Sequence, residues 1–294
     1  MTRAPVRWQA EAIWEAVAPR LPGFTVEILP EIDSTNTELM RRARAGRTEP
    51  TLLVAQAQTA GRGRLGRPWQ SQATGVAATS AGALPSLTFS LGLPLAPADW
   101  SGLSLAVGVS VAESLQPELP APGSGTPRIG LKWPNDLWLD GDRKLGGILV
   151  ETASFVAPQG AGGPAALPAA TRYVVIGIGI NLLARSGDGM NTPPAFLGEV
   201  DASLDAPAAL ARIAAPLVAM LQSFEGYGFA PVQPRFAARD VLRGRAVTLS
   251  DGQAGTAHGV GTDGALQVLT PAGMQSVTSA EISVRPAGRA LPPT

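Results

Sequence analysis

Apolar residues recur every three or four positions in three stretches of the chain, and this spacing predicts three amphipathic helices. They cover residues 6–21, 103–115 and 207–224, with a kink expected in the last at Pro216. A fourth helix is expected after Asp33, because Thr35 and Glu38 match a capping box. It should end near Gly46, with arginines in its last turn.

Short apolar or alternating runs between these helices predict strands. They cover residues 24–29, 51–58, 86–94, 129–133, 136–139, 144–152 and 172–182. In residues 86–94, four apolar side chains from Leu87 to Leu93 alternate onto one face. Asp140-Gly141 predicts a tight hairpin turn into residues 144–152. The fold class expected from this order is α+β.

The pattern changes after Val241, where short strands are separated by Asp251-Gly252 and Asp263-Gly264. This change predicts a small all-β barrel appended to the α+β body. Residues 116–127 and 157–170 consist largely of Ala, Gly and Pro, and we interpret them as unstructured insertions.

Composition restricts the chemistry that this chain can perform. The 294 residues include 23 basic and 23 acidic side chains, so no overall basic field attracts nucleic acid or anionic lipid. The absence of cysteine excludes a disulfide framework, a catalytic thiol and a zinc ribbon. No uninterrupted run of about eighteen apolar residues and no N-terminal signal pattern occurs. We therefore expect a soluble cytoplasmic protein that does not span a membrane.

Two residue types are rare enough to be informative. The only lysines are Lys132 and Lys144, and asparagine occurs only at Asn36, Asn135, Asn181 and Asn191. The chain uses Arg, Ala, Gly and Pro elsewhere, so positions that keep a disfavoured residue are candidates for chemistry that the favoured one cannot perform.

Gly61-Arg62-Gly63-Arg64-Leu65-Gly66-Arg67, the glycine-arginine loop, is the first candidate site. It matches the G-x-G-x-x-G pattern of dinucleotide-binding folds, which needs a helix directly after the glycines and an acidic residue about twenty positions later. Pro68 disfavours a helix, and no Asp or Glu occurs between Gly66 and Asp99. The dinucleotide-binding interpretation is therefore disfavoured.

The chemistry of this loop indicates an anionic ligand. Its glycines let the backbone approach a ligand and turn N–H groups inward. Arg62, Arg64 and Arg67 can bind carboxylate or phosphate with two hydrogen bonds each. A carboxylate beside a nucleotide triphosphate would suit both features. A loop that contacts RNA, or a solvated turn, is the alternative that the loop alone leaves open.

The second candidate site combines Lys132-Trp133-Pro134-Asn135-Asp136 with Lys144 across the predicted hairpin. Asn135 and Asp136 offer oxygen atoms of the kind that Mg²⁺ prefers. The Lys144 ammonium is a compact charge, able to neutralise charge that develops between a carboxylate and an α-phosphate.

Glycine pairs accompany these polar residues. Gly146-Gly147 would allow close approach of a ligand to the backbone, and Gly177-Ile178-Gly179-Ile180-Asn181 combines a glycine-containing strand with a terminal amide. Each segment alone also has a structural explanation, as an exposed strand charge, a bulge or a turn residue. Trp69 directly follows the loop and would be able to cover a purine ring, whereas His258, the single histidine, gives no basis for a histidine triad or metal site.

Together these segments resemble the biotin–protein ligase family over residues from about 24 to 285. The resemblance is carried by Asp33-Ser34-Thr35-Asn36, Gln58 with the loop, residues 132–136, 143–151 and 177–181, and the C-terminal barrel. It implies a mixed-sheet catalytic domain of the biotin/lipoate ligase type with an SH3-like C-terminal barrel. The divisions expected are an N-terminal extension over residues 1–23, the catalytic domain over 24–238, the barrel over 239–288 and a tail over 289–294.

The resemblance also implies a two-step reaction that uses ATP and Mg²⁺. Biotin would attack ATP to give biotinyl-5′-AMP, and a lysine of a biotin carboxyl carrier domain would then take the biotin. The biotin-binding residues implied are Ser34, Thr35, Asn36, Gln58, Gly61, Arg62, Gly63, Arg64, Lys144 and Gly147. Those implied for ATP are Arg64, Arg67, Trp69, Lys132, Asn135 and Asn181. Asn135 and Asp136 are implied as metal ligands, and Lys144 and Arg64 as catalytic residues.

Some features depart from the family or leave alternatives open. Only about two dozen residues precede the catalytic body, too few for the winged helix-turn-helix domain of some relatives, so we expect no DNA binding through such a module. Leu65 stands where some relatives carry another arginine. A homodimer is an expectation from the resemblance. The competing interpretations are a lipoate–protein ligase with the same adenylation chemistry, and a non-catalytic RNA-binding protein.

Overall fold

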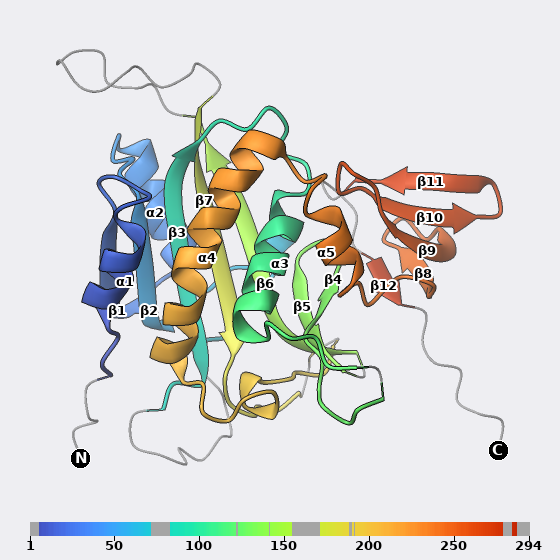
Figure 1. Cartoon of the computed structure of the whole chain (residues 1–294), viewed down its shortest axis with the longest axis horizontal. Helices are drawn as coiled ribbons and strands as arrows, with labels where there is room; N and C mark the ends of the chain where they lie inside the picture. Colours follow the sequence, from blue (N-terminus) through green and yellow to red (C-terminus); the bar gives the residue numbers. More distant parts are fainter. Residues whose placement is uncertain are drawn as a thin grey trace.

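A mixed seven-stranded sheet forms the body of the protein (Figure 1). In spatial order its strands are β1 (Thr25–Ile32), β2 (Thr51–Gln58), β3 (Ser86–Leu95), β7 (Arg172–Asn181), β6 (Arg143–Ala153), β5 (Asp136–Leu139) and β4 (Gly130–Lys132). β1 and β2 are parallel, and every other neighbouring pair is antiparallel. The computed structural model describes residues 6–71, 83–121, 123–140, 142–154, 171–187, 190, 192–278 and 284–286. The predicted insertion over residues 157–170, Gly141 of the predicted turn, Asn191 and the predicted tail lie outside the described residues.

Helices cover both faces of this sheet. The helices are α1 (Ala10–Val17), α2 (Thr35–Arg44), α3 (Leu103–Leu115), α4 (Ala206–Tyr227) and α5 (Gln233–Ala237), with short 3₁₀ turns at Arg64–Gly66 and Leu197–Glu199. α4 packs against α1 and α3 in front of the sheet as drawn, whereas α2 lies behind it (Figure 1). The predicted α+β body is therefore confirmed, although α1 is shorter than expected and β1 extends further.

The two faces of β7 differ in side-chain volume, and this difference positions the site. Val174, Ile176, Ile178 and Ile180 belong to the main core, which β7 shares with α3 and α4. On the opposite face, Val175 packs with Leu39, Met40 and Ala43 of α2 in a second apolar cluster. The next residues on that face are Gly177 and Gly179, because side chains alternate along a strand. On this face β7 is thus apolar under α2 and carries no side chain at Gly177 and Gly179.

The start of α2 differs from the capping box predicted for Thr35 and Glu38. Ser34 is the N-cap residue, and its hydroxyl accepts a hydrogen bond from Thr37 N at 3.4 Å. The helix therefore begins one residue earlier than the capping box requires, and Glu38 instead pairs with Arg42 at 2.8 Å. This shift frees the Thr35 side chain to face the sheet.

A five-stranded antiparallel sheet follows the body and confirms the predicted all-β C-terminal unit. Its spatial order is β11 (Gly273–Val277), β10 (Leu266–Thr270), β9 (Ala254–Val260), β8 (Ala246–Leu249) and β12 (Val284–Pro286). Trp133 Nε1 donates to Gly264 O at 3.1 Å, and Gln233 Nε2 donates to Val260 O at 2.7 Å. These bonds dock the small sheet beside β4 and α5 (Figure 1). The expected domain boundary at residue 239 stays a prediction.

α4 is long and apolar enough, by length and composition alone, to cross a membrane. In this structure 56% of the relevant window is buried, and α4 packs along α3 and β3. Burial of this kind is typical of a core helix, and the N-cap contact of Asp205 to Ala208 N at 2.9 Å fixes where the helix begins.

Candidate active site

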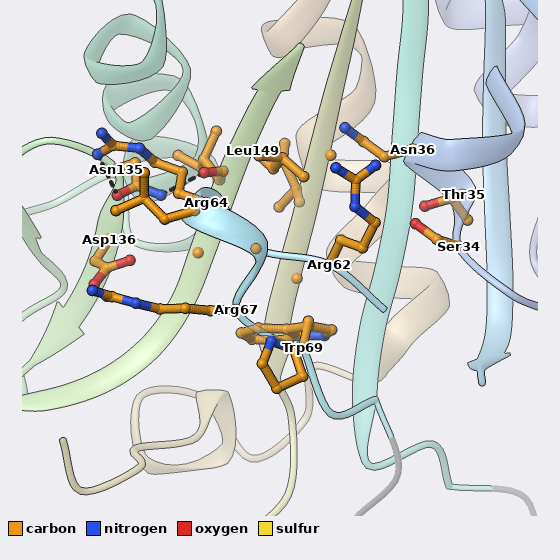
Figure 2. A pocket seen from close by; sticks show the side chains of 18 of the residues that line it. Ser34, Thr35, Asn36, Arg62, Arg64, Arg67, Trp69, Asn135, Asp136 and Leu149 are labelled. Atoms are coloured by element: carbon orange, nitrogen blue, oxygen red, sulfur yellow. Dashed lines mark hydrogen bonds between the residues drawn. The ribbon is translucent and has the colours of Figure 1, made fainter. Parts of the chain in front are cut away.

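A cavity of about 190 Å³ lies on the face of the large sheet that α2 covers. It is lined by Ser34, Thr35, Asn36, Gln58, Arg62, Gly63, Arg64, Leu65, Arg67, Pro68, Trp69, Phe89, Lys132, Pro134, Asn135, Asp136, Lys144, Gly147, Ile148, Leu149, Gly177, Ile178 and Gly179. All predicted site residues except Gly61 and Asn181 are in this set. Figure 2 shows Ser34, Thr35, Asn36 and Arg62 at one end, Arg64, Arg67, Asn135 and Asp136 at the other, and Trp69 with Leu149 between them.

Glycines on two neighbouring strands form the floor of the cavity. Gly179 of β7 pairs with Gly147 of β6, and Gly177 follows on the same face of β7. On its other side, Gly177 pairs with Ser90 of β3. The floor is therefore largely backbone, which leaves room for side chains and a ligand above it.

The two β7 glycines are required by particular neighbours. A Cβ on Gly177 would lie 2.2 Å from Asn36 Oδ1, and a Cβ on Gly179 would lie 2.4 Å from the Trp69 indole. Both separations are far below van der Waals contact. The missing methyl groups thus let Asn36 and Trp69 lie directly against the sheet.

A chain of hydrogen bonds crosses the end of the cavity beneath α2. Thr35 N donates to Gln58 Oε1 at 2.8 Å, and the Thr35 and Ser90 hydroxyl oxygens are 2.7 Å apart. Ser90 Oγ donates to Asn36 Oδ1 at 2.7 Å, and Asn36 Nδ2 donates to Glu151 Oε2 at 2.9 Å. These five residues form one continuous polar network, in which Thr35 and Ser90 are buried.

The chemistry of the partners fixes the direction of this network. Gln58 must present Oε1 to the Thr35 N–H, which only donates, and Asn36 must present Nδ2 to the Glu151 carboxylate, which only accepts when ionised. Ser90 has one proton, which it gives to Asn36 Oδ1, so the 2.7 Å contact needs the Thr35 proton. Gln58 Oε1, at 3.2 Å from Thr35 Oγ1, is the more distant acceptor for that same proton. The lone pairs of Thr35 Oγ1 therefore remain as acceptors for a ligand.

The glycine-arginine loop is closed on itself by backbone bonds. Gly63 N donates to Arg67 O at 2.7 Å, and Trp69 N donates to Gly61 O at 2.8 Å. Between these bonds the chain makes a single 3₁₀ turn at Arg64–Gly66. Over residues 61–69 the chain thus forms a hairpin rather than the start of a helix. A dinucleotide-binding loop would need a helix here, and the sequence disfavoured one because of Pro68.

The other end of the cavity is cationic. Arg64, Arg67, Lys132 and Lys144 line it, and Asp136 is the one carboxylate among the described lining residues. Lys144 Nζ donates to Asp136 Oδ1 at 2.6 Å. Because four cations face a single anion, this end attracts a ligand that carries several negative charges.

Repulsion between the cations at this end affects the pKa of Lys132. Its ammonium lies 5.2 Å from the centroid of the Trp138 ring. Burial lowers the pKa of Lys132, Asp136 opposes that decrease, and three neighbouring cations lower the pKa further. A bound polyanion would reverse the repulsive part of this effect and stabilise the charged form of Lys132.

Gly61 and Asn181 lie outside the lining and act on it indirectly. A Cβ on Gly61 would lie 2.5 Å from Trp69 O, so this glycine permits the hairpin to close. Asn181 Nδ2 donates to Lys144 O at 3.2 Å and to Ala195 O at 3.0 Å. Arg185, at 2.6 Å from Asn181 Oδ1, also donates to the backbone of Gln70. Asn181 thus holds the strand that carries Lys144 and, through Arg185, the segment after the loop.

Sequence reasoning missed Ser90 and Glu151 as parts of the site. The signal for Ser90 was present, since Ser86, Thr88 and Ser90 alternate with the apolar residues of the same strand and so mark a polar face. Glu151 had no local signal, because its importance comes from contacts with Asn36 and Arg62, both about ninety or more positions away.

Comparison with known proteins places this site in a family. Residues 28–160 match the Biotin/lipoate A/B protein ligase family, and residues 243–285 match the Biotin protein ligase C terminal domain. The chain is 35% identical over 273 residues to the bifunctional ligase/repressor BirA of Escherichia coli strain K12, covering 91% of this chain and 76% of that protein. The chain belongs to the biotin–protein ligase family.

Two further members of the family are matched by this chain over almost their whole length. The biotin--[acetyl-CoA-carboxylase] ligase of Paracoccus denitrificans is 33% identical, with 87% of this chain and 98% of that protein covered. The biotin protein ligase from Aquifex aeolicus, solved in complex with biotin and ATP, is 26% identical with a TM-score of 0.67. That similarity covers 89% of this chain and 99% of the solved chain.

Replacing Gly177 with alanine tests the packing of the cavity floor. The added methyl group would collide with Asn36 Oδ1, so we expect Gly177→Ala to lower the free energy of unfolding by about 1–3 kcal/mol. Gly226→Ala in α4 is the matched control, because a Cβ there meets no atom within 4 Å and alanine favours a helix over glycine. Urea unfolding would measure both variants. An unchanged stability of Gly177→Ala would show that the floor does not need glycine.

Proposed function

We propose that this chain is an ATP-dependent biotin–protein ligase, which makes biotinyl-5′-AMP and transfers biotin to a lysine of a biotin carboxyl carrier domain. The observation that carries the proposal is one cavity in which a hydrogen-bonded end, where Glu151 balances the charge of Arg62, continues into a cationic end. One substrate of the reaction has a neutral ring and a carboxylate, and the other has a triphosphate, so each end matches one of them.

The end beneath α2 has the hydrogen-bonding pattern of a cyclic urea site. A urea ring presents a carbonyl acceptor flanked by N–H donors. The Ser34 hydroxyl and Gln58 Nε2 have no acceptor among the described residues, so both are available to donate, while Thr35 Oγ1 is available to accept. Biotin's ureido ring fits this arrangement, with the oxygen toward the donors and an N–H toward Thr35.

The same pattern disfavours lipoate. The dithiolane ring of lipoate has neither a strong acceptor nor an N–H, and it would leave these buried polar groups without partners. A site built to bind a polar group commonly rejects an analogue that lacks it by a factor of about 10⁴.

An RNA-binding function is disfavoured by the placement of the arginines. Arg62 Nη2 donates to Glu151 at 3.2 Å and Arg64 Nη1 donates to Asn135 at 3.4 Å, so both guanidinium groups are held by side chains of the site. The chain also has a formal net charge of zero, whereas an RNA-binding surface usually carries a basic stripe.

In the proposed first step, an oxygen of the biotin carboxylate attacks the α-phosphorus of ATP. The bond from that phosphorus to the bridging oxygen breaks, and pyrophosphate leaves with the electron pair. Lys144, whose Nζ lies over the bare backbone of Gly147, supplies a positive charge where the carboxylate and α-phosphate meet. Arg64, Arg67 and Lys132 would hold the phosphates and offset their repulsion of the incoming carboxylate.

In the second step, the uncharged amine of the acceptor lysine attacks the acyl carbon of biotinyl-5′-AMP. AMP leaves with the electron pair of the broken bond, and the new amide nitrogen loses a proton. Trp69 lies against Gly179 between the two ends of the cavity, where it would border the nucleotide and shield the mixed anhydride from water. Asn181 would act indirectly, because its side chain donates to the backbone carbonyl of Lys144 and holds that residue in place.

A magnesium ion fits this site only together with phosphate oxygens. Among the described residues, no group of three or more His, Cys, Asp or Glu side chains gathers to hold a metal. Mg²⁺ is commonly held by one or two carboxylates, water and substrate phosphates, so Asp136 would supply the protein ligand. Asn135 is less available, since its Oδ1 accepts from Arg64 and its Nδ2 donates to Ile148 O at 2.6 Å. The bound ion would neutralise phosphate charge. A cytoplasmic location and a homodimer stay predictions.

The reaction can be tested by supplying ATP, magnesium chloride and either biotin or lipoate to the purified chain. We expect biotin to release pyrophosphate and lipoate to do so about 10⁴-fold less efficiently. Labelled biotin should then appear on a biotin carboxyl carrier domain only when ATP is present. Pyrophosphate release with lipoate but not with biotin would contradict the assignment of biotin as the substrate. Salt-sensitive RNA binding without ATP turnover would contradict the proposed ligase reaction.

Lys144→Ala tests the proposed centre of the adenylation step. We expect the rate of biotin-dependent exchange of pyrophosphate into ATP to fall by about 10²- to 10³-fold, with little change in stability because the Lys144 side chain is one-third exposed. Arg143→Ala is the matched control: Arg143 precedes Lys144, is equally exposed, and pairs with Glu199 at 2.7 Å outside the cavity. Similar exchange rates in both variants would remove Lys144 from the mechanism.

A further inference from the structure

One carboxylate joins two walls of the cavity from behind. Glu151 Oε2 accepts from Asn36 Nδ2 at 2.9 Å, and Glu151 Oε1 accepts from Arg62 Nη2 at 3.2 Å. Asn36 belongs to α2 and Arg62 to the glycine-arginine loop, whereas Glu151 lies on β6. Glu151 itself does not line the cavity, although Asn36 and Arg62 both do.

We propose that Glu151 is a positioning residue, which sets the hydrogen-bond direction of the ureido-binding end and links that end to the glycine-arginine loop. This assignment rests on the proposed function and extends it to a residue that would not touch the substrate.

The first part of the assignment follows from the proton order of the network. An ionised carboxylate only accepts, so Glu151 forces Asn36 to turn Nδ2 toward it and Oδ1 toward Ser90. Ser90 then has to donate to Asn36, and the 2.7 Å contact between Ser90 and Thr35 takes the Thr35 proton rather than the 3.2 Å contact to Gln58 Oε1. Thr35 Oγ1 keeps both lone pairs for a ligand because Glu151, two hydrogen bonds beyond Ser90, cannot donate.

A glutamine at position 151 would remove this constraint while keeping nearly the same shape. Its amide can donate as well as accept, so Asn36 would be free to present either atom to Ser90. If Nδ2 faces Ser90, the Ser90 proton turns toward Thr35, and the Thr35 proton turns toward Gln58 Oε1 at 3.2 Å or toward the ligand. The ureido N–H would then compete with Ser90 for Thr35 Oγ1, or meet a donor there.

The second part of the assignment concerns the loop. Arg62 is anchored by Glu151 and by a longer contact from Nη1 to Thr37 Oγ1 at 3.4 Å. Both anchors belong to the ureido-binding end, so the arm of the loop that carries Arg62 is held there. Arg64 and Arg67 are directed to the cationic end. Loss of Glu151 should therefore weaken biotin binding more than ATP binding.

The test compares Glu151→Gln with Glu113→Gln. Glu113 also pairs with an arginine, Arg235, and has a similar side-chain exposure, 31% against 24%, but it lies outside this cavity. Calorimetry without ATP would measure the affinity for biotin and for two analogues, each methylated on one ureido nitrogen. We expect Glu151→Gln to bind biotin about 10- to 100-fold more weakly and to discriminate less against methylation, with the KM for ATP within about two-fold of wild type. Glu113→Gln should match wild type throughout.

Ser90→Ala supplies an independent variant, because it interrupts the network between Asn36 and Thr35 while leaving the contact of Glu151 with Arg62 in place. If both residues act through one chain of bonds, the double variant should bind biotin less weakly than the product of the single losses predicts.

Several results would overturn the assignment. They are biotin affinity of Glu151→Gln within about two-fold of wild type, equal losses for biotin and both methylated analogues, or fully additive effects with Ser90→Ala. A wild-type protein that binds no biotin would instead overturn the proposed function, and this assignment with it.

Discussion

Two positions on one face of β7 carry no Cβ, and the arrangement above them depends on that absence. Gly177 leaves the space that the Asn36 amide occupies, and Gly179 leaves the space under the Trp69 indole. The residue before them on the same face, Val175, packs under α2 as an ordinary apolar contact. A sheet that continued this apolar face would have filled the cavity. The glycines instead let polar and aromatic side chains approach the backbone closely.

The open floor brings two kinds of chemistry into one cavity. At one end, the network through Thr35, Ser90 and Asn36 is neutral and has a fixed proton order. At the other end, Lys144 and its cationic neighbours surround a single carboxylate, Asp136. Arg62 also lies at the first end, where Glu151 balances its charge. The proposed ligase function follows from this separation, with biotin spanning both ends so that its carboxylate meets the phosphates.

The sequence predicted the parts of this site whose signal is local. The rarity of lysine singled out Lys132 and Lys144, which both line the cavity. The glycine-arginine loop indicated an anionic ligand, and its three arginines line the cavity as well. The start of α2 was misplaced by one residue, because the Ser-Thr pair offers two caps and only tertiary contacts choose between them. Ser90 lies on a polar face that the alternation of its strand marks, but its pairing with Gly177 depends on strand register, which the sequence does not show. Glu151 was missed because Asn36 and Arg62, its partners, are distant in sequence. The nucleotide role that the family pattern gives Asn181 stays a prediction, and in this structure its side chain donates to the backbone of Lys144.

On the proposed function, one cavity binds biotin in a single orientation, with the ring beneath α2 and the carboxylate toward the cations. The most direct measurement is a crystal structure of the chain with biotin and a non-hydrolysable ATP analogue. We expect the ureido oxygen within hydrogen-bond distance of the Ser34 hydroxyl, a ureido nitrogen within that distance of Thr35 Oγ1, and the biotin carboxylate beside Lys144. Biotin bound in the reverse orientation, or outside this cavity, would contradict the proposed binding mode.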